Sequence, residues 1–229
     1  MNYKRSALVI GATGLIGAHL KEEILRNPDY GTLTILVRRQ LQEKHQKLTE
    51  IKADFDSLSS YKQYFHVDDL YICLGTTKKK AGTQENFRKV DYDYVVKAAR
   101  LAKECGVKRV AVVSAIGADA NSRFFYNHIK GEMEKALSEI GIPSTYIFRP
   151  SLLLGDREEF RMGERIGEVL GNAINPILKG KLKKYRSVQG KVVAQAMVKF
   201  LKDARDGVHV VESDLIAKIG ELGSAIRRS

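Results

Sequence analysis

The stretch ALVIGATGLIGAHL, residues 7–20, joins a short apolar run to an amphipathic segment through three glycines. The apolar run is typical of a buried strand, and the segment that follows Gly17 is typical of a helix. A glycine-rich turn between a strand and a helix directs the free N–H groups of the helix at an anion such as a pyrophosphate. The spacing GxxGxxG departs from the standard GxGxxG fingerprint, so a turn that binds no ligand is the alternative.

The three glycines have separate tasks in a dinucleotide-binding turn. Gly11 allows the tight turn, Gly14 lets the backbone approach a pyrophosphate, and Gly17 lets the helix pack closely on the sheet. The residues of this turn that we expect to contact the cofactor are Gly11, Thr13, Gly14, Leu15, Ile16 and Gly17.

Two basic residues, Lys4 and Arg5, precede the apolar run, which is also how a secretion signal begins. Glycines interrupt the run and no small-residue cleavage site follows, so we do not expect a signal. The two cysteines, Cys73 and Cys105, have neither metal-ligand spacing nor the number that a disulfide framework needs. A cytoplasmic location and no bound metal are therefore expected. Because no apolar run approaches about 20 residues, no membrane partner is expected either.

The composition is that of a soluble globular protein, since 44% of the 229 residues are hydrophobic and 29% are charged. The net charge of +12 favours anionic ligands without identifying them. The chain contains no tryptophan and no recognition-helix motif, so nucleic acid is not expected as a partner. The amphipathic helices could cover a sheet or pair two chains, which leaves a monomer and a homodimer open.

Short apolar runs alternate with amphipathic segments along the chain. This alternation predicts an α/β fold, a Rossmann-type doubly wound parallel sheet with a small C-terminal substrate-side portion. We expect a single domain over residues 1–229, with a cofactor-binding core at about 1–150 and the substrate-side and C-terminal portion at about 151–229. Within that portion, residues 156–186 are expected to form helices and loops. The predicted strands are 7–12, 33–39, 48–55, 69–75, 107–115, 144–155 and 207–212, and the predicted helices are 15–27, 87–106, 124–141 and 187–203.

The end of the second predicted strand indicates which dinucleotide is bound. An NAD site has an acidic residue there, whereas this chain has Arg38 and Arg39, whose guanidinium groups suit a 2′-phosphate. NADP(H) is therefore the expected cofactor, and two merely exposed arginines are the alternative. Asp54 is positioned to contact the adenine amino group. The strand ends expected to touch the cofactor contribute Arg38, Arg39, Asp54, Phe55, Leu74, Gly75 and Thr76.

Three further residues predict catalytic chemistry: Ser114 at the end of the fifth strand, and Tyr126 and Lys130 on the helix that follows. Tyr126 and Lys130 share one helix face, so the ammonium would lower the phenol pKa and make Tyr126 an acid or base. Ser114 would bind the same substrate oxygen, and all three would also contact the cofactor, with Lys130 on the nicotinamide ribose. Tyrosine and lysine at this spacing alone are also common on surface helices.

With these motifs, residues 5–210 resemble the atypical, extended-like branch of the short-chain dehydrogenase/reductase superfamily. Within it they are similar to the Tat-interactive-protein group of NADP-binding reductases, through LVRRQ, YICLGTTKKKAGTQENFRKVDYDYVVKAARLAKECGVKRV, GADANSRFFYNHIKGEMEKAL and FRPSLLLGDREE. The resemblance implies an NADPH-binding Rossmann domain with a Ser114, Tyr126 and Lys130 triad. It also implies a segment near the nicotinamide that contains Arg149, Pro150, Leu152 and Leu153. One departure is Asp91, which stands where the extended branch often has asparagine.

The expected function is that of an NADPH-dependent oxidoreductase, which transfers hydride to a small carbonyl substrate while Tyr126 acts as the acid or base. The alternative is an NADPH-sensing regulatory or binding protein with little turnover. The sequence does not identify the substrate, because the expected pocket walls lie in its least patterned part.

Overall fold

A computed structural model describes residues 3–154, 183 and 185–226, and the side chains of this range up to residue 220. Its centre is a sheet of seven parallel strands in the order β3-β2-β1-β4-β5-β6-β9. The chain winds outward from β1 in both directions, so the predicted doubly wound Rossmann topology is confirmed. The strands are β1 (Arg5–Ile10), β2 (Tyr30–Val37), β3 (Leu48–Lys52), β4 (Asp69–Ile72), β5 (Arg109–Val113), β6 (Ser144–Arg149) and β9 (Gly207–Glu212).

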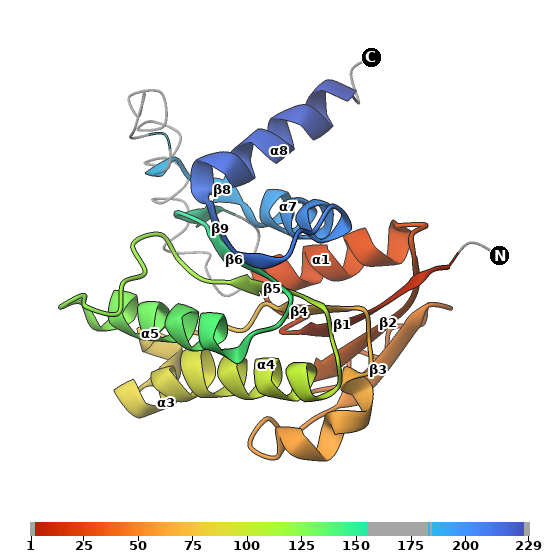
Figure 1. Cartoon of the computed structure of the whole chain (residues 1–229), viewed down its shortest axis with the longest axis horizontal. Coiled ribbons are helices and arrows are strands. Elements are labelled where there is room, and N and C mark those ends of the chain that lie inside the picture. Colours follow the sequence, from red (N-terminus) through yellow and green to blue (C-terminus); the bar gives the residue numbers. More distant parts are fainter. Residues whose placement is uncertain (1–2, 155–182, 184, 227–229) are drawn as a thin grey trace.

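Helices cover both faces of the sheet. In β1, Ala7 and Val9 pack into one apolar core while Leu8 and Ile10 pack into the other, as alternation along a strand requires. Helices α1 (Leu15–Arg26) and α7 (Gly190–Lys202) lie over the first core, and α4 (Tyr94–Glu104) and α5 (Phe125–Ile140) over the second (Figure 1). Apolar runs without polar alternation are the expected pattern for strands buried on both faces.

Two predicted elements are divided. The helix expected over 87–106 consists of the end of α3 (Gln84–Arg88), a π-helical turn η2 (Lys89–Asp93) and α4. The strand expected over 144–155 ends at Arg149, because Pro150 has no N–H to continue a ladder. The remaining elements are η1 (Leu58–Phe65), α2 (Lys78–Ala81), the pair β7 (Leu153–Leu154) and β8 (Val188–Gln189), and α8 (Ser213–Ile226), which was not predicted.

The expectation of helices and loops over residues 156–186 falls almost entirely outside the described residues. Within the described part of the chain, no helix has both the length and the apolar character that crossing a bilayer requires.

A buried polar cluster lies at the amino edge of the sheet, where β2 and β4 begin. The phenol oxygens of Tyr30 and Tyr71 are 2.7 Å apart, and the Tyr30 hydroxyl donates to Asp69 at 2.6 Å. Arg109 also pairs with Asp69. Every polar atom of the cluster therefore has a partner, as burial demands.

Candidate functional site

The glycine turn after β1 forms a cradle that no larger residue fits. Gly11 has a φ of +89°, and a Cβ there would lie 2.6 Å from the carbonyl carbon of Cys73. A Cβ on Gly17 would lie 2.0 Å from the carbonyl oxygen of Gly11. Helix α1 starts at Leu15, and its N-cap residue, Gly14, has no side chain to satisfy the first N–H groups. A close backbone turn with open N–H groups fits a pyrophosphate.

The other residues predicted in this turn divide between the surface and the core. Thr13 is exposed at the tip, whereas Ile16 and Gly17 are buried beneath it. Leu15 is half-buried and approaches α7, where a Cβ on Gly190 would lie 2.9 Å from its Cγ. An anion at this turn would therefore be bound by backbone N–H groups rather than by these apolar side chains.

Arg38 and Arg39 follow β2 at the carboxyl edge of the sheet. Both side chains are exposed, and neither forms an ion pair with a residue that the structure describes. Two guanidinium groups without a carboxylate partner leave a local positive charge beside the glycine turn. Their contact with a 2′-phosphate stays a prediction.

The residues after β3 form a local turn. Asp54 accepts hydrogen bonds from the Asp56 N–H at 3.0 Å and from the Ser57 hydroxyl at 3.1 Å. Phe55 is buried and packs against the Tyr94 ring, with centroids 5.7 Å apart. Asp54 itself remains exposed, so it is accessible at the edge where the adenine is predicted to bind.

Asp91 links the segment after β4 to helix α5 through a hydrogen bond and a buried ion pair. The Thr76 N–H donates to one carboxylate oxygen of Asp91 at 2.9 Å, and the other oxygen lies 2.8 Å from Nζ of Lys130. The Asp91 and Lys130 side chains are 1% and 3% exposed. Leu74 packs on the neighbouring core, and Gly75 is exposed. Asp91 thus links the segment after β4, which is predicted to contact the cofactor, to Lys130 of α5.

The position of Asp91 coincides with an irregularity of the helix. It is the middle residue of η2, and π-helical turns are frequent at functional sites. An asparagine, as is frequent in the extended branch, would provide no charge here, whereas Asp91 neutralises a buried ammonium. The departure noted in the sequence therefore changes the electrostatics of the site.

Tyr126 lies in the first turn of α5, half-buried, with its ring edge-on to Phe87 at a centroid distance of 5.7 Å. Burial raises the pKa of Tyr126 above its ordinary value, the charge of Lys130 lowers it, and Asp91 raises it again. The net direction is upward. The expected lowering of the Tyr126 pKa by Lys130 is therefore outweighed, because burial disfavours the phenolate and Asp91 opposes the ammonium.

Ser114 follows β5 and is buried, and its hydroxyl donates to Glu134 of α5 at 2.5 Å. The Arg149 Nε donates to the same Glu134 oxygen at 3.0 Å, and another Arg149 nitrogen lies 3.1 Å from Glu212. Arg149, expected near the nicotinamide by resemblance, is thus engaged in ion pairs. Glu134 and Glu212 were not predicted, although Glu134 stands four residues after Lys130 on the same helix face.

The remaining predicted residues follow Arg149. Pro150 is buried, and its carbonyl accepts from the Ile116 N–H at 3.0 Å. Leu152 is exposed and Leu153 is half-buried in β7. These contacts hold the segments after β5 and β6 side by side at the carboxyl edge.

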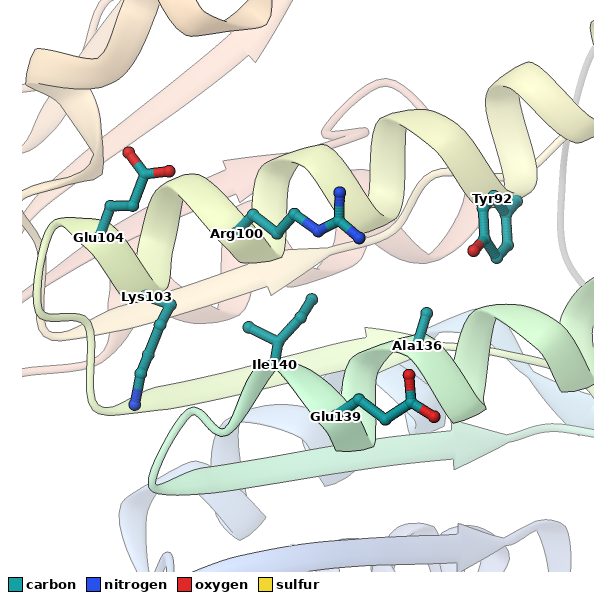
Figure 2. A pocket seen from close by; sticks show the side chains of 7 residues that line it. All are labelled: Tyr92, Arg100, Lys103, Glu104, Ala136, Glu139 and Ile140. Atoms are coloured by element: carbon teal, nitrogen blue, oxygen red, sulfur yellow. The ribbon is translucent and has the colours of Figure 1, made fainter.

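A cavity of about 370 Å³ lies between α4 and α5 and contains none of the predicted site residues. Figure 2 shows the lining side chains, which come from α4 and α5 and, for Tyr92, from η2. A second cavity, of about 410 Å³, is lined by Phe55 and by residues of α3, η2 and α4. Among the described residues, no group of three or more histidine, cysteine, aspartate or glutamate side chains could hold a metal ion.

Comparison with known proteins agrees with this geometry. Residues 11–204 match the model of the NAD(P)H-binding family. Protein HTATIP2 of Rattus norvegicus is 39% identical over 164 residues, which cover 70% of this chain and 67% of that protein. The mitochondrial protein FMP52 of Eremothecium gossypii is 36% identical over 218 residues, 91% of this chain and 94% of that protein.

Solved structures share the fold at low identity. The enzyme WbmH of Bordetella bronchiseptica in complex with NAD+ has a TM-score of 0.68 and 15% identity, covering 91% of this chain and 75% of that chain. MoeE5 in complex with UDP-glucose and NAD has a TM-score of 0.67 and 18% identity, covering 96% and 82%. These likenesses establish the Rossmann fold.

The comparisons also correct the expected location. Relatives that match almost over their whole length, including FMP52 of Candida albicans at 34% identity, are named as mitochondrial proteins, so the cytoplasmic prediction was wrong. Its basis was the two free cysteines, which indicate reducing conditions that more than one compartment provides. The family model and the relatives agree on one assignment: the chain belongs to the NAD(P)H-binding family, among the atypical short-chain dehydrogenase/reductase-like proteins related to HTATIP2 and FMP52.

Proposed function

We propose that this protein is an NADPH-dependent oxidoreductase that reduces a small carbonyl compound, with Tyr126 as the proton donor. The observation that carries the proposal is the buried Asp91–Lys130 ion pair. The buried ammonium of Lys130 lies one helical turn from Tyr126, whose side chain is half-buried. A buried charge beside a titratable group is typical of a catalytic site.

The chain has groups suited to each part of the cofactor. The N–H groups at the start of α1 would bind the pyrophosphate, and Arg38 and Arg39 would bind the 2′-phosphate that distinguishes NADP from NAD. The exposed carboxylate of Asp54 would accept from the adenine amino group. When bound, the reduced nicotinamide supplies a hydride.

Tyr126 is suited to donate a proton. Because the pKa of Tyr126 is raised, the phenol keeps its proton at neutral pH and can give it from Oη to the carbonyl oxygen of the substrate. The Lys130 ammonium then stabilises the phenolate that remains. Burial of the phenol, more than the nearby carboxylate, raises the Tyr126 pKa and keeps this residue protonated between turnovers. Asp91 holds Lys130 in place and partly offsets its charge.

The test is NADPH consumption over a panel of small aldehydes and ketones, comparing the wild-type protein with Tyr126→Phe. Removal of the proton donor is expected to lower kcat by about 100-fold or more, while NADPH binding persists. Tyr92→Phe is the matched control, since Tyr92 lies outside the site in the cavity between α4 and α5. A Tyr126→Phe variant as active as the wild type would refute the mechanism. Tight NADPH binding without turnover on any substrate would instead favour a cofactor-sensing protein.

A further inference from the structure

Arg38 and Arg39 leave the sheet next to the glycine turn. Ile10, the last residue of β1, lies beside Leu36 in the parallel ladder. From Ile10 the chain continues into the turn, and one residue beyond Leu36 it leaves β2 for the two arginines. Both arginines are exposed, and neither forms an ion pair with a described residue. Their charge is therefore open to an anion at the turn where the pyrophosphate is proposed to bind.

The carboxylate that follows the arginines most closely in sequence is held by helix α1. Glu43 stands four residues after Arg39, and its carboxylate pairs with the Lys21 ammonium. The Lys21 side chain is 11% exposed and that of Glu43 is 32% exposed, whereas Glu22, 3.9 Å from the same ammonium, is more exposed. A buried ammonium needs a counter-charge, so Glu43 is bound to Lys21 rather than to an arginine.

The backbone of this loop bends to make the contact. Gln42 has a φ of +57°, a left-handed conformation that a residue with a Cβ keeps only where the surrounding contacts enforce it. One such contact precedes it, because the Leu41 N–H donates to the Glu50 carboxylate of β3. The other follows it, in the Lys21–Glu43 pair. Both acidic side chains of this region are therefore occupied by the fold.

We propose that Lys21 is a positioning residue for cofactor choice, because it holds Glu43 on α1 and so leaves Arg38 and Arg39 free for the 2′-phosphate of NADPH. This inference rests on the proposed NADPH-dependent function. A Glu43 carboxylate released from Lys21 would pair with an arginine or repel the phosphate. It could also accept a hydrogen bond from the 2′-hydroxyl of NADH, which is the role of the acidic residue in an NAD site. Loss of Lys21 is therefore expected to shift the preference towards NADH.

The experiment titrates the protein with NADPH and with NADH in a calorimeter and takes the ratio of the two dissociation constants, Kd for NADH over Kd for NADPH. Lys21→Met removes the buried charge and keeps a long side chain. The ratio is expected to fall about tenfold, the effect of losing one guanidinium contact with the phosphate. Glu43→Gln leaves no carboxylate to release and is expected to keep the wild-type ratio. The double variant Lys21→Met/Glu43→Gln is expected to recover that ratio.

A matched control separates the release of a carboxylate from a loosened loop. The Lys47 Nζ donates to the carbonyl oxygens of Leu25 and Asn27, at 3.1 and 3.0 Å, at the end of α1. Lys47→Met removes the same charge and a contact between the same loop and α1, but it releases no carboxylate, so the ratio is expected to stay unchanged. Far-UV circular dichroism reports the fold. If Lys21→Met does not fold, Lys21→Gln makes the same test, because its neutral amide holds Glu43 only weakly.

Three results would overturn the inference. The first is a Lys21→Met ratio equal to that of the wild type. The second is an equal fall in Lys21→Met, Glu43→Gln and Lys47→Met, which would mean that these contacts only hold the loop. The third is a double variant that fails to recover the ratio.

The same titrations distinguish this inference from the proposed function. If Arg38→Ala and Arg39→Ala lower the ratio but Lys21→Met does not, this inference alone fails. A wild-type ratio near one refutes the proposed NADPH preference and this inference together. A lack of turnover with an intact NADPH preference, and with the expected effect of Lys21→Met, refutes the proposed reductase activity and supports this inference.

Discussion

Asp91→Asn tests the electrostatics of the site, because it removes one charge of a buried pair and preserves the size of the side chain. The Lys130 Nζ lies 2.8 Å from the carboxylate, and both side chains are almost fully buried. At an effective dielectric constant of about 20, two unit charges at that distance attract by about 6 kcal/mol. Desolvation offsets part of this, and removal of one partner from a buried pair costs about 3–5 kcal/mol. We expect a loss of that size in the free energy of unfolding.

Urea unfolding followed by far-UV circular dichroism measures this loss, since the chain has no tryptophan for fluorescence. Lys130→Met alone is expected to destabilise as well. The double variant Asp91→Asn/Lys130→Met should lose less than the sum of the two, because no unpaired charge remains. A loss below about 1 kcal/mol for Asp91→Asn, or strict additivity, would refute the ion pair as a strong interaction.

The same variant also predicts a change in pH dependence. Asp91 raises the pKa of Tyr126 and Lys130 lowers it, so removal of the Asp91 charge is expected to lower this pKa. Reductase activity that depends on the protonated phenol would then begin to fall at a lower pH than in the wild type. A shift of this alkaline limb to higher pH would contradict the assigned signs.

Two further predictions concern cofactor choice and alkaline stability. Arg38→Ala and Arg39→Ala are each expected to weaken NADPH binding by about tenfold in a calorimetric titration and to leave NADH binding unchanged. Arg26→Ala is the control, because it makes the same charge change at the far end of α1. Equal losses of affinity for both nucleotides would count against a 2′-phosphate contact. Burial raises the pKa of Tyr71 well above 10, so the unfolded chain loses this proton near pH 10 while the folded chain keeps it. The free energy of unfolding should therefore fall above pH 10, by up to about 1.4 kcal/mol per pH unit from this residue. Urea titrations at pH 9 to 11 should show a smaller slope for Tyr71→Phe.

Local patterns were sufficient for the parts of the fold that depend on neighbours in sequence. The strand, turn and helix around Gly11 and Gly17 could be predicted because close packing at those two positions excludes any side chain. The break of β6 was missed although Pro150 is visible in the sequence, because an apolar run continues after it. The π-helical turn at Asp91 has no comparable signal, since its residues also fit an ordinary amphipathic helix.

The electrostatics of the site could not be predicted in this way, because they depend on which distant residues neutralise each charge. Lys130 was expected to lower the pKa of Tyr126, a sound inference for a lysine four residues away. Asp91, 39 positions earlier, neutralises that lysine, and burial of the phenol adds a larger effect in the same direction. Likewise Ser114 suggests a donor to the substrate until Glu134 is found to accept its hydrogen. In both cases a buried carboxylate that is itself paired with a cation changes the surroundings of a predicted site residue, and neither carboxylate is near that residue in sequence.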